Sequence, residues 1–298
     1  MPEKQLVNPQ QSFYPQIRVT SETTRQCFGL TWQETVHLAD KHTMSVQGWL
    51  SSRSPQAKGF DGVGTKVTST GIKVSLLNLV LGSNFPPQTK DEIISDEIER
   101  VKEFLSKSGT PFNWWLSPRS APSDMGSRLI GHGFKAEEYH LPTMVAPLPM
   151  FVEGPTLNPR VQVWQASNRL DLEFASTIRR VAFGFAEGVA LTYFEDMSDD
   201  WLRGDPARLY LARVGEQGHP AAIGALIMGD RLPGVYVMAT LPQWERQGLG
   251  KAILAQILSD ATTDGHELII LTAGAQAYSL YRQFGFEHIF EYTIYSLV

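Results

Sequence analysis

The sequence predicts an α+β protein with two domains, each a mixed and mainly antiparallel sheet flanked by helices. A proline-rich segment divides the 298-residue chain near its middle. After this segment, three strands follow one another closely and a strand–helix–strand unit comes next. Before it, the chain shows the same order of strand, helix, strand and helix that ends the second part. The length fits two domains, because single domains usually have roughly 100–200 residues.

The proline-rich segment runs from Leu141 to Pro159 and holds five prolines. Proline lacks an amide donor and fixes φ, so we expect the middle of this segment to be poor helix and poor central strand. We therefore predict one domain over residues 1–150 and a second domain over residues 151–298.

The first part of the chain reads as alternating helices and strands. The helices show apolar residues at helical spacing, and the strands are short apolar or aromatic runs. The predicted helices are Thr31–Trp49, Asp91–Leu105 and Ser123–Ile130, and the predicted strands are Val74–Leu81, Phe112–Leu116 and Lys135–Leu141.

The second part has a clearer pattern. The turn sequence GEQGHP joins two apolar runs as in a β-hairpin, and LIILT is apolar throughout, as in a strand buried on both faces. A parallel crossover is expected between the strand at Val235 and the strand at Leu268. The predicted strands are Val161–Gln165, Leu209–Val214, Ala222–Met228, Gly234–Thr240, Leu268–Thr272 and Ile289–Ser296; the predicted helices are Arg169–Ala182, Lys251–Thr263 and Ala275–Gln283.

Composition excludes several classes of function. The net charge of −5 and the lack of a Lys/Arg run argue against nucleic acid as a partner. The single cysteine, Cys27, leaves no intramolecular disulfide and no multi-cysteine metal site, so no metal is expected. The N-terminus lacks the apolar core of a signal peptide, and no apolar run is long enough to span a membrane. We expect a soluble, cytoplasmic protein without a membrane partner.

The stretch from Pro242 to Leu258 carries the strongest chemical signal. A strand ends at Leu241, a turn with Gly248 and Gly250 follows, and a helix begins there. The first N–H groups of a helix have no partner within it, and glycines let the backbone approach a ligand closely. Such a turn binds phosphate, and Arg246 and Lys251 add positive charge. A turn that only starts a helix is the simpler interpretation, and neither the P-loop nor the dinucleotide pattern is present.

The turn resembles the acetyl-CoA pyrophosphate motif of the GNAT superfamily of N-acetyltransferases, (Q/R)-x-x-G-x-(G/A). Pro242 lies six residues before the first glycine of the motif, and the later sequence AYSLYRQFGF resembles the family's A-x-x-x-Y-x-x-x-G-F ending. One helix and one apolar strand separate the two motifs, as that fold requires. The sequence departs from the motif at Glu245, where the family usually has Gln or Arg, and at Gly274, where Asn or Ser is frequent.

The resemblance implies an N-acyltransferase that moves acetyl from acetyl-CoA to an amine of a small molecule, amino acid or peptide. The pantetheine chain would lie between the strands Tyr236–Thr240 and Leu268–Thr272. An amide N–H there, that of Met238, would polarise the thioester carbonyl, and Tyr281 would give a proton to the departing thiolate. The residues implied in binding acetyl-CoA are Met238, Ala239, Thr240, Arg246, Gln247, Gly248, Leu249, Gly250, Lys251, Ala273 and Tyr281.

The general base is not indicated. The strand Tyr236–Thr240 has no acid, although many members of the family have one there. Glu187, Glu195 and Asp196 lie in a segment that forms part of the acceptor site in this fold. They fit a solvated acidic face, or recognition of a cationic substrate, as well as a catalytic base.

The first domain resembles a second, degenerate GNAT unit. Its LIGHGFKAEE parallels YRQFGFEHIF, but its turn GSNFPPQTKDE lacks G-x-G and contains two prolines. The position equivalent to Tyr281 falls near Leu129–Ile130, so the acid is missing. We expect a non-catalytic domain. The alternative for the whole chain is a non-catalytic acyl-CoA-binding regulatory module, which Glu245 and the missing strand acid favour.

Overall fold

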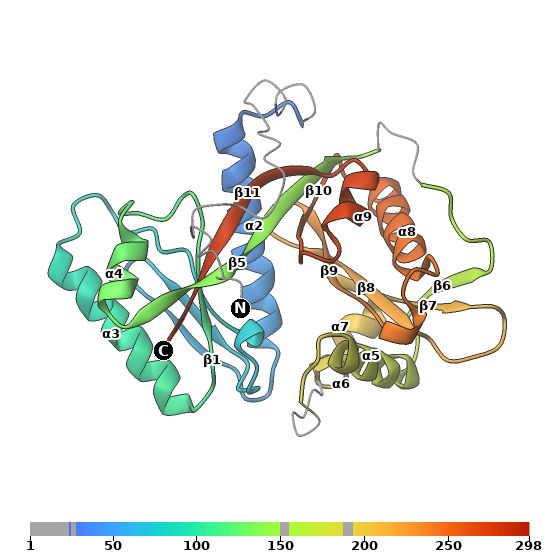
Figure 1. Ribbon diagram of the computed structural model, residues 1–298, viewed down its shortest axis with the longest axis horizontal. Helices are drawn as coiled ribbons and strands as arrows, with labels where there is room; N and C mark the ends of the chain where they lie inside the picture. Colours follow the sequence, from blue (N-terminus) through green and yellow to red (C-terminus); the bar gives the residue numbers. More distant parts are fainter. Residues whose placement is uncertain (1–23, 25–27, 150–154, 187–192, 298) are drawn as a thin grey trace, which may run out of the picture.

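The computed structural model describes residues 24, 28–149, 155–186 and 193–297. It is an α+β structure in which helices flank a large sheet (Figure 1). The helices are α2 (Trp32–Ser52), α3 (Asp91–Ser108), α4 (Met125–Gly131), α5 (Arg169–Ala182), α6 (Tyr193–Asp196), α7 (Ser198–Arg203), α8 (Leu249–Thr263) and α9 (Tyr278–Gln283), with 3₁₀ turns η1 (Ser75–Leu77) and η2 (Pro242–Trp244). None of the described helices is long and apolar enough to cross a membrane.

In the described part of the chain, eleven strands form one continuous sheet in the order β1-β2-β3-β4-β11-β5-β10-β9-β8-β7-β6. Neighbouring strands are antiparallel except for two parallel pairs, β3–β4 and β9–β10. The second of these is the crossover that the sequence predicts. The strands are β1 (Lys58–Asp61), β2 (Lys66–Ser69), β3 (Asn78–Leu81), β4 (Asn113–Leu116), β5 (Phe134–Pro147), β6 (Val161–Gln165), β7 (Ala207–Val214), β8 (Ala222–Met228), β9 (Pro233–Thr240), β10 (Leu268–Thr272) and β11 (Glu287–Leu297).

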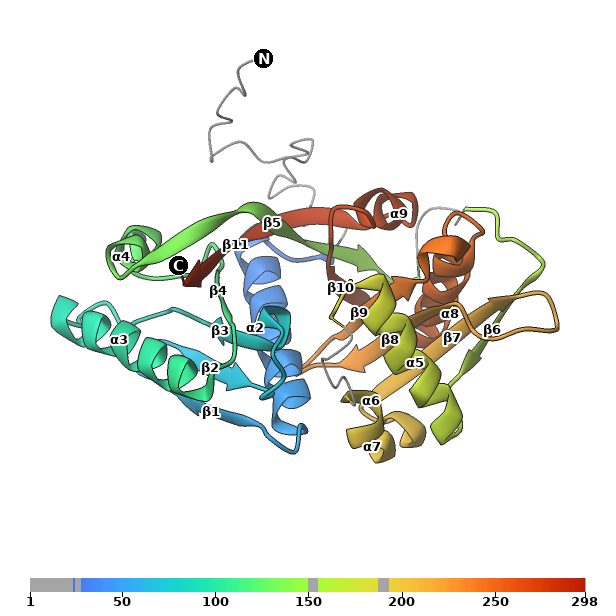
Figure 2. The same cartoon turned by 60° about the horizontal axis from the view of Figure 1, so that its bottom comes forward.

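Two strands join the halves of the molecule. β5 comes from the first half of the chain but pairs with β10 of the second half, over Thr143–Pro147. β11 comes from the second half but pairs with β4 of the first half. The two strands also pair with each other, and they lie side by side across the middle of the molecule (Figures 1 and 2). Each half therefore completes the sheet of the other.

The predicted strand Lys135–Leu141 continues to Pro147 as β5, so the first residues of the proline-rich segment lie in the middle of the sheet. The two prolines lie where the ladder with β10 stops. Pro147 pairs with the first residue of β10, and Pro142 lies just past the pair Thr143–Thr272. A missing N–H does little harm at the ends of a ladder, so both prolines are accommodated.

The other predicted elements agree closely with the structure, with two differences. The predicted strand Val74–Leu81 forms only from Asn78, because residues 75–77 make the turn η1. The Asn78 amide nitrogen lies 2.8–2.9 Å from the carbonyl oxygens of Ile72, Val74 and Pro111, which holds this turn. The strands β1 and β2 and the short helices α6 and α7 were not predicted.

The helices of the second half cover both faces of the sheet, and side chains of β7 point alternately toward the two cores. Tyr210 and Ala212 belong to the core under α8 and α9, whereas Leu209 and Leu211 belong to the core under α5, α6 and α7 (Figure 1). The second core also includes Val46 and Leu50 of α2 and Leu77 of η1. The first half therefore packs directly against α5 and the adjoining strands.

Candidate functional site

A cavity of about 1320 Å³ lies between the two halves of the molecule. Pockets for one small molecule usually measure about 300–1,000 Å³, so this cavity has room for more than one ligand. It is lined by the β9 segment Val235–Thr240, by the turn Trp244–Lys251, by residues near the end of β10 and in α9, and by residues of the first half of the chain.

The cavity opens where two parallel strands separate. β9 and β10 pair only at Gly234–Ile270 and Val235–Leu271. Beyond that point a bulge follows on β9, where Val237 has a positive φ of 50° and the register with β8 shifts. The N–H of Leu241 donates to Ala221 on the β8 side. Because N–H groups alternate along a strand, those of Thr240 and Met238 point into the gap.

The turn before α8 is a cradle of backbone N–H groups. Arg246 and Gly248 have positive φ values of 59° and 90°, and α8 begins at Leu249. The first helical hydrogen bond is from the N–H of Ala252 to the oxygen of Gly248, at 3.0 Å. Within the described residues, no group accepts a hydrogen bond from the N–H groups of residues 247–251. Free N–H groups at a helix start bind anions such as phosphate.

Asn158 fixes the shape of this turn and was not singled out from the sequence. Its side-chain nitrogen donates to the carbonyl oxygen of Gln247 at 2.9 Å. A Cβ at Gly248 would lie 3.2 Å from the Cβ of Asn158, in addition to the strain of a positive φ. In the sequence, Asn158 is only one residue of a proline-rich segment. Nothing there indicates a contact with Gln247, which lies 89 residues later.

Charge around the turn is mostly positive. Lys251 is partly buried and Arg246 is exposed, and both line the cavity. Glu245, the residue that departs from the expected motif, is also exposed, so water screens its negative charge. The turn therefore remains suited to an anionic ligand.

Tyr281 of α9 lines the same cavity and is 4% exposed. Its ring packs edge-on against that of Phe286, with 5.9 Å between the two ring centres. Burial raises the pKa of the Tyr281 phenol well above its usual value of 10, so the phenol keeps its proton at neutral pH. Tyr278, one turn earlier, does not line the cavity; its hydroxyl lies 3.4 Å from Nδ1 of His288.

Most of the other residues that the sequence implies in acetyl-CoA binding line the same cavity. Met238, Ala239, Thr240 and the whole stretch Arg246–Lys251 line the cavity together with Tyr281. Ala273 is fully buried and its N–H donates to Pro142, while its neighbours Thr272 and Gly274 line the cavity.

The acidic candidates lie elsewhere. Glu195 accepts a hydrogen bond from the Ser176 hydroxyl at 2.6 Å, and Asp196 is exposed. Neither residue is part of the cavity lining. Glu187 lies outside the described residues.

No comparable gap exists among the described residues of the first half, 28–149. Its parallel strands β3 and β4 pair at Leu79–Asn113 and Val80–Trp114, and the chain continues to be linked beyond them. Ala121 donates to Ser83 and accepts from Phe85, at 2.8 and 3.0 Å. The indole of Trp114 also donates to the Ser83 hydroxyl, at 2.6 Å. These contacts lie at the position that corresponds to the divergence of β9 and β10 in the second half, and they keep that position closed.

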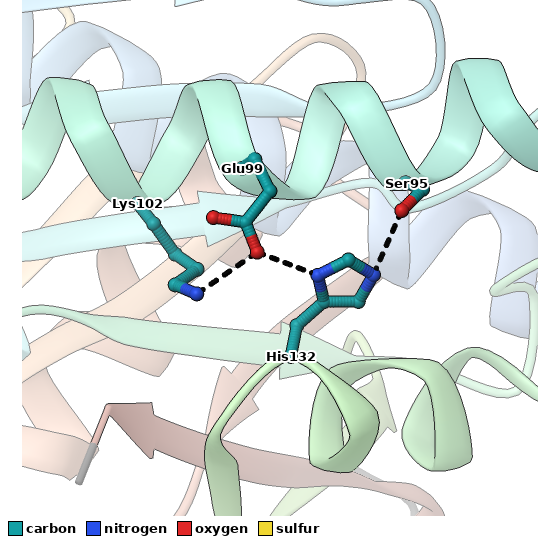
Figure 3. A network of polar contacts seen from close by, with 4 residues as sticks. All are labelled: Ser95, Glu99, Lys102 and His132. Atoms are coloured by element: carbon teal, nitrogen blue, oxygen red, sulfur yellow. Dashed lines mark hydrogen bonds and ion pairs between the residues drawn. The ribbon is translucent and has the colours of Figure 1, made fainter.

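A polar network on the surface of the first half joins α3 to the end of α4 (Figure 3). His132 lies between two α3 residues, with Nε2 3.1 Å from the Ser95 hydroxyl and Nδ1 2.7 Å from Glu99. Lys102 also donates to Glu99, at 2.9 Å. These two hydrogen bonds, led by that of His132, lower the pKa of Glu99. None of the four residues lines the cavity, so the network is a brace between helices.

Residues 205–288 match the family model described as "Acetyltransferase (GNAT) domain". No curated protein matches the sequence significantly.

Among solved structures, a GCN5-related N-acetyltransferase from Kribbella flavida is 20% identical, with 88% of this chain and 94% of that chain covered at a TM-score of 0.64. A GCN5-related N-acetyltransferase from Sphaerobacter thermophilus is 14% identical, with 88% and 92% covered at a TM-score of 0.59. A tandem GNAT protein from the clavulanic acid biosynthesis pathway is 13% identical, with 89% and 94% covered at a TM-score of 0.58. At such identities these likenesses show the fold. Residues 205–288 therefore match a GNAT domain, and the chain as a whole, including its N-terminal part, has a GNAT-like fold similar to that of a tandem GNAT protein.

Proposed function

We propose that this chain transfers an acetyl group from acetyl-CoA to the amine of a small molecule, amino acid or peptide. One observation carries the proposal: the free N–H groups of residues 247–251, the gap between β9 and β10, and Tyr281 all line a single cavity. Residues 151–298 would form the catalytic domain. Residues 1–150 would form a non-catalytic domain, since their equivalent gap is closed.

The diphosphate of acetyl-CoA would bind at the turn before α8. The N–H groups of residues 247–251 donate to its oxygens, and the positive end of the helix dipole favours its charge. Arg246 offers a planar guanidinium suited to bidentate contact, and Lys251 offers a point charge. Exposed Glu245 stays in water beside this turn.

The pantetheine chain would lie along β9, where the pairing with β10 has ended. The N–H of Thr240 and the adjoining backbone of Ala239 offer hydrogen bonds to its amides. The N–H of Met238 donates to the thioester carbonyl oxygen and stabilises the negative charge that develops there. The bulge at Val237 sets the direction of this N–H.

In the reaction, the neutral amine nitrogen attacks the thioester carbon and a C–N bond forms. The C–S bond then breaks, and the thiolate takes a proton from Tyr281. The nitrogen releases its surplus proton through water, because the described lining holds a single carboxylate, Glu245, and no histidine. That proton restores the Tyr281 phenol. The products are an amide and coenzyme A.

A non-catalytic acyl-CoA-binding module is the alternative, and the lack of an acid on β9 favours it. Acetyl-CoA binding by thermal shift, combined with thiol release across a panel of amines, separates the two. A thermal shift with thiol release only when an amine is present supports the acetyltransferase. A thermal shift without thiol release from any amine supports the module, and no shift at all contradicts both.

A further inference from the structure

One wall of the cavity comes from the first half of the chain. Its apolar part consists of Leu50 of α2, Leu76 and Leu77 of η1, Trp115 of β4 and Leu141 of β5. Leu50 and Leu77 also belong to the core under α5, so packing holds this wall in place. The first half therefore supplies a preformed surface that a ligand in the cavity need not order.

The shared strand β11 brings Trp115 to this cavity. Ile294 of β11 pairs with Trp115 of β4, and Tyr292 of the same strand pairs with Leu141 of β5. The indole ring of Trp115 packs against the ring of Tyr292, with 5.3 Å between the two ring centres. Trp115 and Leu141 thus reach the cavity from the two strands that flank β11.

The indole N–H of Trp115 is a buried donor that lacks an acceptor. The side chain is 4% exposed, and no described group accepts a hydrogen bond from its Nε1. The neighbouring Trp114 belongs to a different core, and its N–H donates to the Ser83 hydroxyl at 2.6 Å. An unpaired buried donor costs free energy, and a buried indole usually finds a partner. Because Trp115 lines the cavity, a bound ligand can supply the missing acceptor.

Two other described tryptophans, Trp49 and Trp201, also have a buried indole N–H without a described acceptor. Their rings pack edge to face against each other, with 6.2 Å between the ring centres, and neither residue lines the cavity. Of these three tryptophans, Trp115 is therefore the one that a ligand in the cavity meets.

We propose that Trp115 binds the acceptor, and that the acceptor is an amine with an oxygen atom that accepts a hydrogen bond, as in an amino acid, an amino acid amide or an amino alcohol. This inference rests on the proposed acetyltransferase function and names the class of its acceptor. The indole N–H donates to the oxygen, while Leu76 and Leu141 remove the apolar part of the ligand from water. An amine without such an oxygen leaves the donor unpaired and gains nothing from it.

The test compares kcat/KM of the unmodified protein with that of Trp115→Phe, with acetyl-CoA as donor. Leucine, leucinamide and leucinol carry a carboxylate, a carbonyl and a hydroxyl oxygen on the same apolar group, and 3-methylbutylamine is their counterpart without oxygen. Tyramine and phenethylamine form a second pair, in which the oxygen lies further from the amine. Each acceptor is compared with itself in the two proteins, so differences between the pKa values of the amines cancel.

Trp115→Phe keeps an aromatic ring beside Tyr292 but removes the donor. We expect kcat/KM to fall about fivefold, the equivalent of one neutral hydrogen bond, for the oxygen-bearing acceptor that the protein uses best. The value for its oxygen-free counterpart and the KM for acetyl-CoA should not change. Trp49→Phe is the matched control, because it also removes an unpaired indole N–H, and it should not distinguish the acceptors. Trp115→Met, which also lacks a donor, gives the same comparison if the Phe variant does not fold.

Equal losses for acceptors with and without oxygen would overturn the role of Trp115. So would an unchanged kcat/KM for every oxygen-bearing acceptor, turnover of the oxygen-free amines alone, or the same pattern of losses in Trp49→Phe. Failure of the proposed function has a different signature, since none of the amines would then release thiol from acetyl-CoA.

Discussion

The side chain of Asn158 donates a hydrogen bond to the backbone oxygen of Gln247, a residue 89 positions later in the chain. Asn158 also accepts from the N–H of Arg160 at 3.0 Å, so its amide is oriented from both ends. Asn158 therefore helps to hold the turn 247–251, whose N–H groups face the cavity, although it lies far from this turn in the sequence.

Replacing Asn158 by Ala should weaken acetyl-CoA binding. One neutral hydrogen bond is lost, which is worth about 1 kcal/mol, and the N–H groups of the turn lose their alignment. We expect the Kd for CoA from calorimetry to rise about five- to tenfold, with kcat at saturating acetyl-CoA nearly unchanged. An unchanged Kd would mean that the turn keeps its shape without Asn158.

Gly248→Ala should be more harmful than Gly250→Ala. A side chain at Gly248 requires a positive φ of 90° and brings Cβ to 3.2 Å from Asn158, whereas a Cβ at Gly250 would meet nothing closer than 3.7 Å. A non-glycine residue in a left-handed conformation costs about 1–2 kcal/mol. Urea unfolding should therefore show a lower stability for Gly248→Ala and no loss for Gly250→Ala. Equal stabilities would contradict the backbone conformation described here.

Tyr281→Phe should lower kcat about a hundredfold while acetyl-CoA binding persists, because the thiolate loses its proton donor. Tyr278→Phe, one turn away and outside the cavity lining, should change kcat little. The protonated phenol is the active form and burial raises its pKa above 10, so kcat of the unmodified protein should not fall between pH 7 and 10 on account of this group. Full turnover by the Phe variant at every pH would exclude Tyr281 from the reaction.

Residues 151–298 should not give a stable protein when produced alone. Without β5, the edge of β10 and one side of β11 lose their partners, and exposed edges of apolar strands favour aggregation. We expect insoluble material that becomes soluble when residues 1–150 are co-expressed. A soluble, cooperatively unfolding fragment would show that the shared strands are dispensable.

The network in Figure 3 should make a pH-dependent contribution to stability. Hydrogen bonds from His132 and Lys102 lower the pKa of Glu99, so the stabilisation is present above the pKa of the unfolded state and is lost as pH falls through the folded value. Glu99→Gln should lower the free energy of unfolding at pH 7 but not at pH 3. The effect is small, because the network is exposed. Glu103→Gln, in an exposed pair with Lys107, should show a weaker difference between the two pH values.

Local signals in the sequence accounted for much of the fold. The helix α2 begins where Thr31 and Glu34 form a capping box, and α5, β6, β8 and β10 have the predicted bounds. The bounds of those elements follow from the spacing of apolar residues and from capping residues, and both are visible within a short stretch of sequence. The turn before α8 was predicted for the same reason, since glycines, a strand and a helix follow one another directly.

What could not be predicted depends on contacts between distant segments. The extension of β5 from Leu141 to Pro147 was not predicted, because it depends on pairing with β10, a strand more than 120 residues later in the chain. The contact of Asn158 with Gln247, and the wall that α2 and η1 add to the cavity, exist only after the halves have packed. The strands β1 and β2 have weak apolar patterns.

The exchange of β5 and β11 has a consequence for how the chain reaches its native state during synthesis. β4 can pair with β3 early, but it cannot gain its second partner until residues 293–296 have been made, more than 170 residues later on the ribosome. Folding of the first half must therefore wait for the last strand, and the waiting edge of β4 is one that chaperones would have to protect.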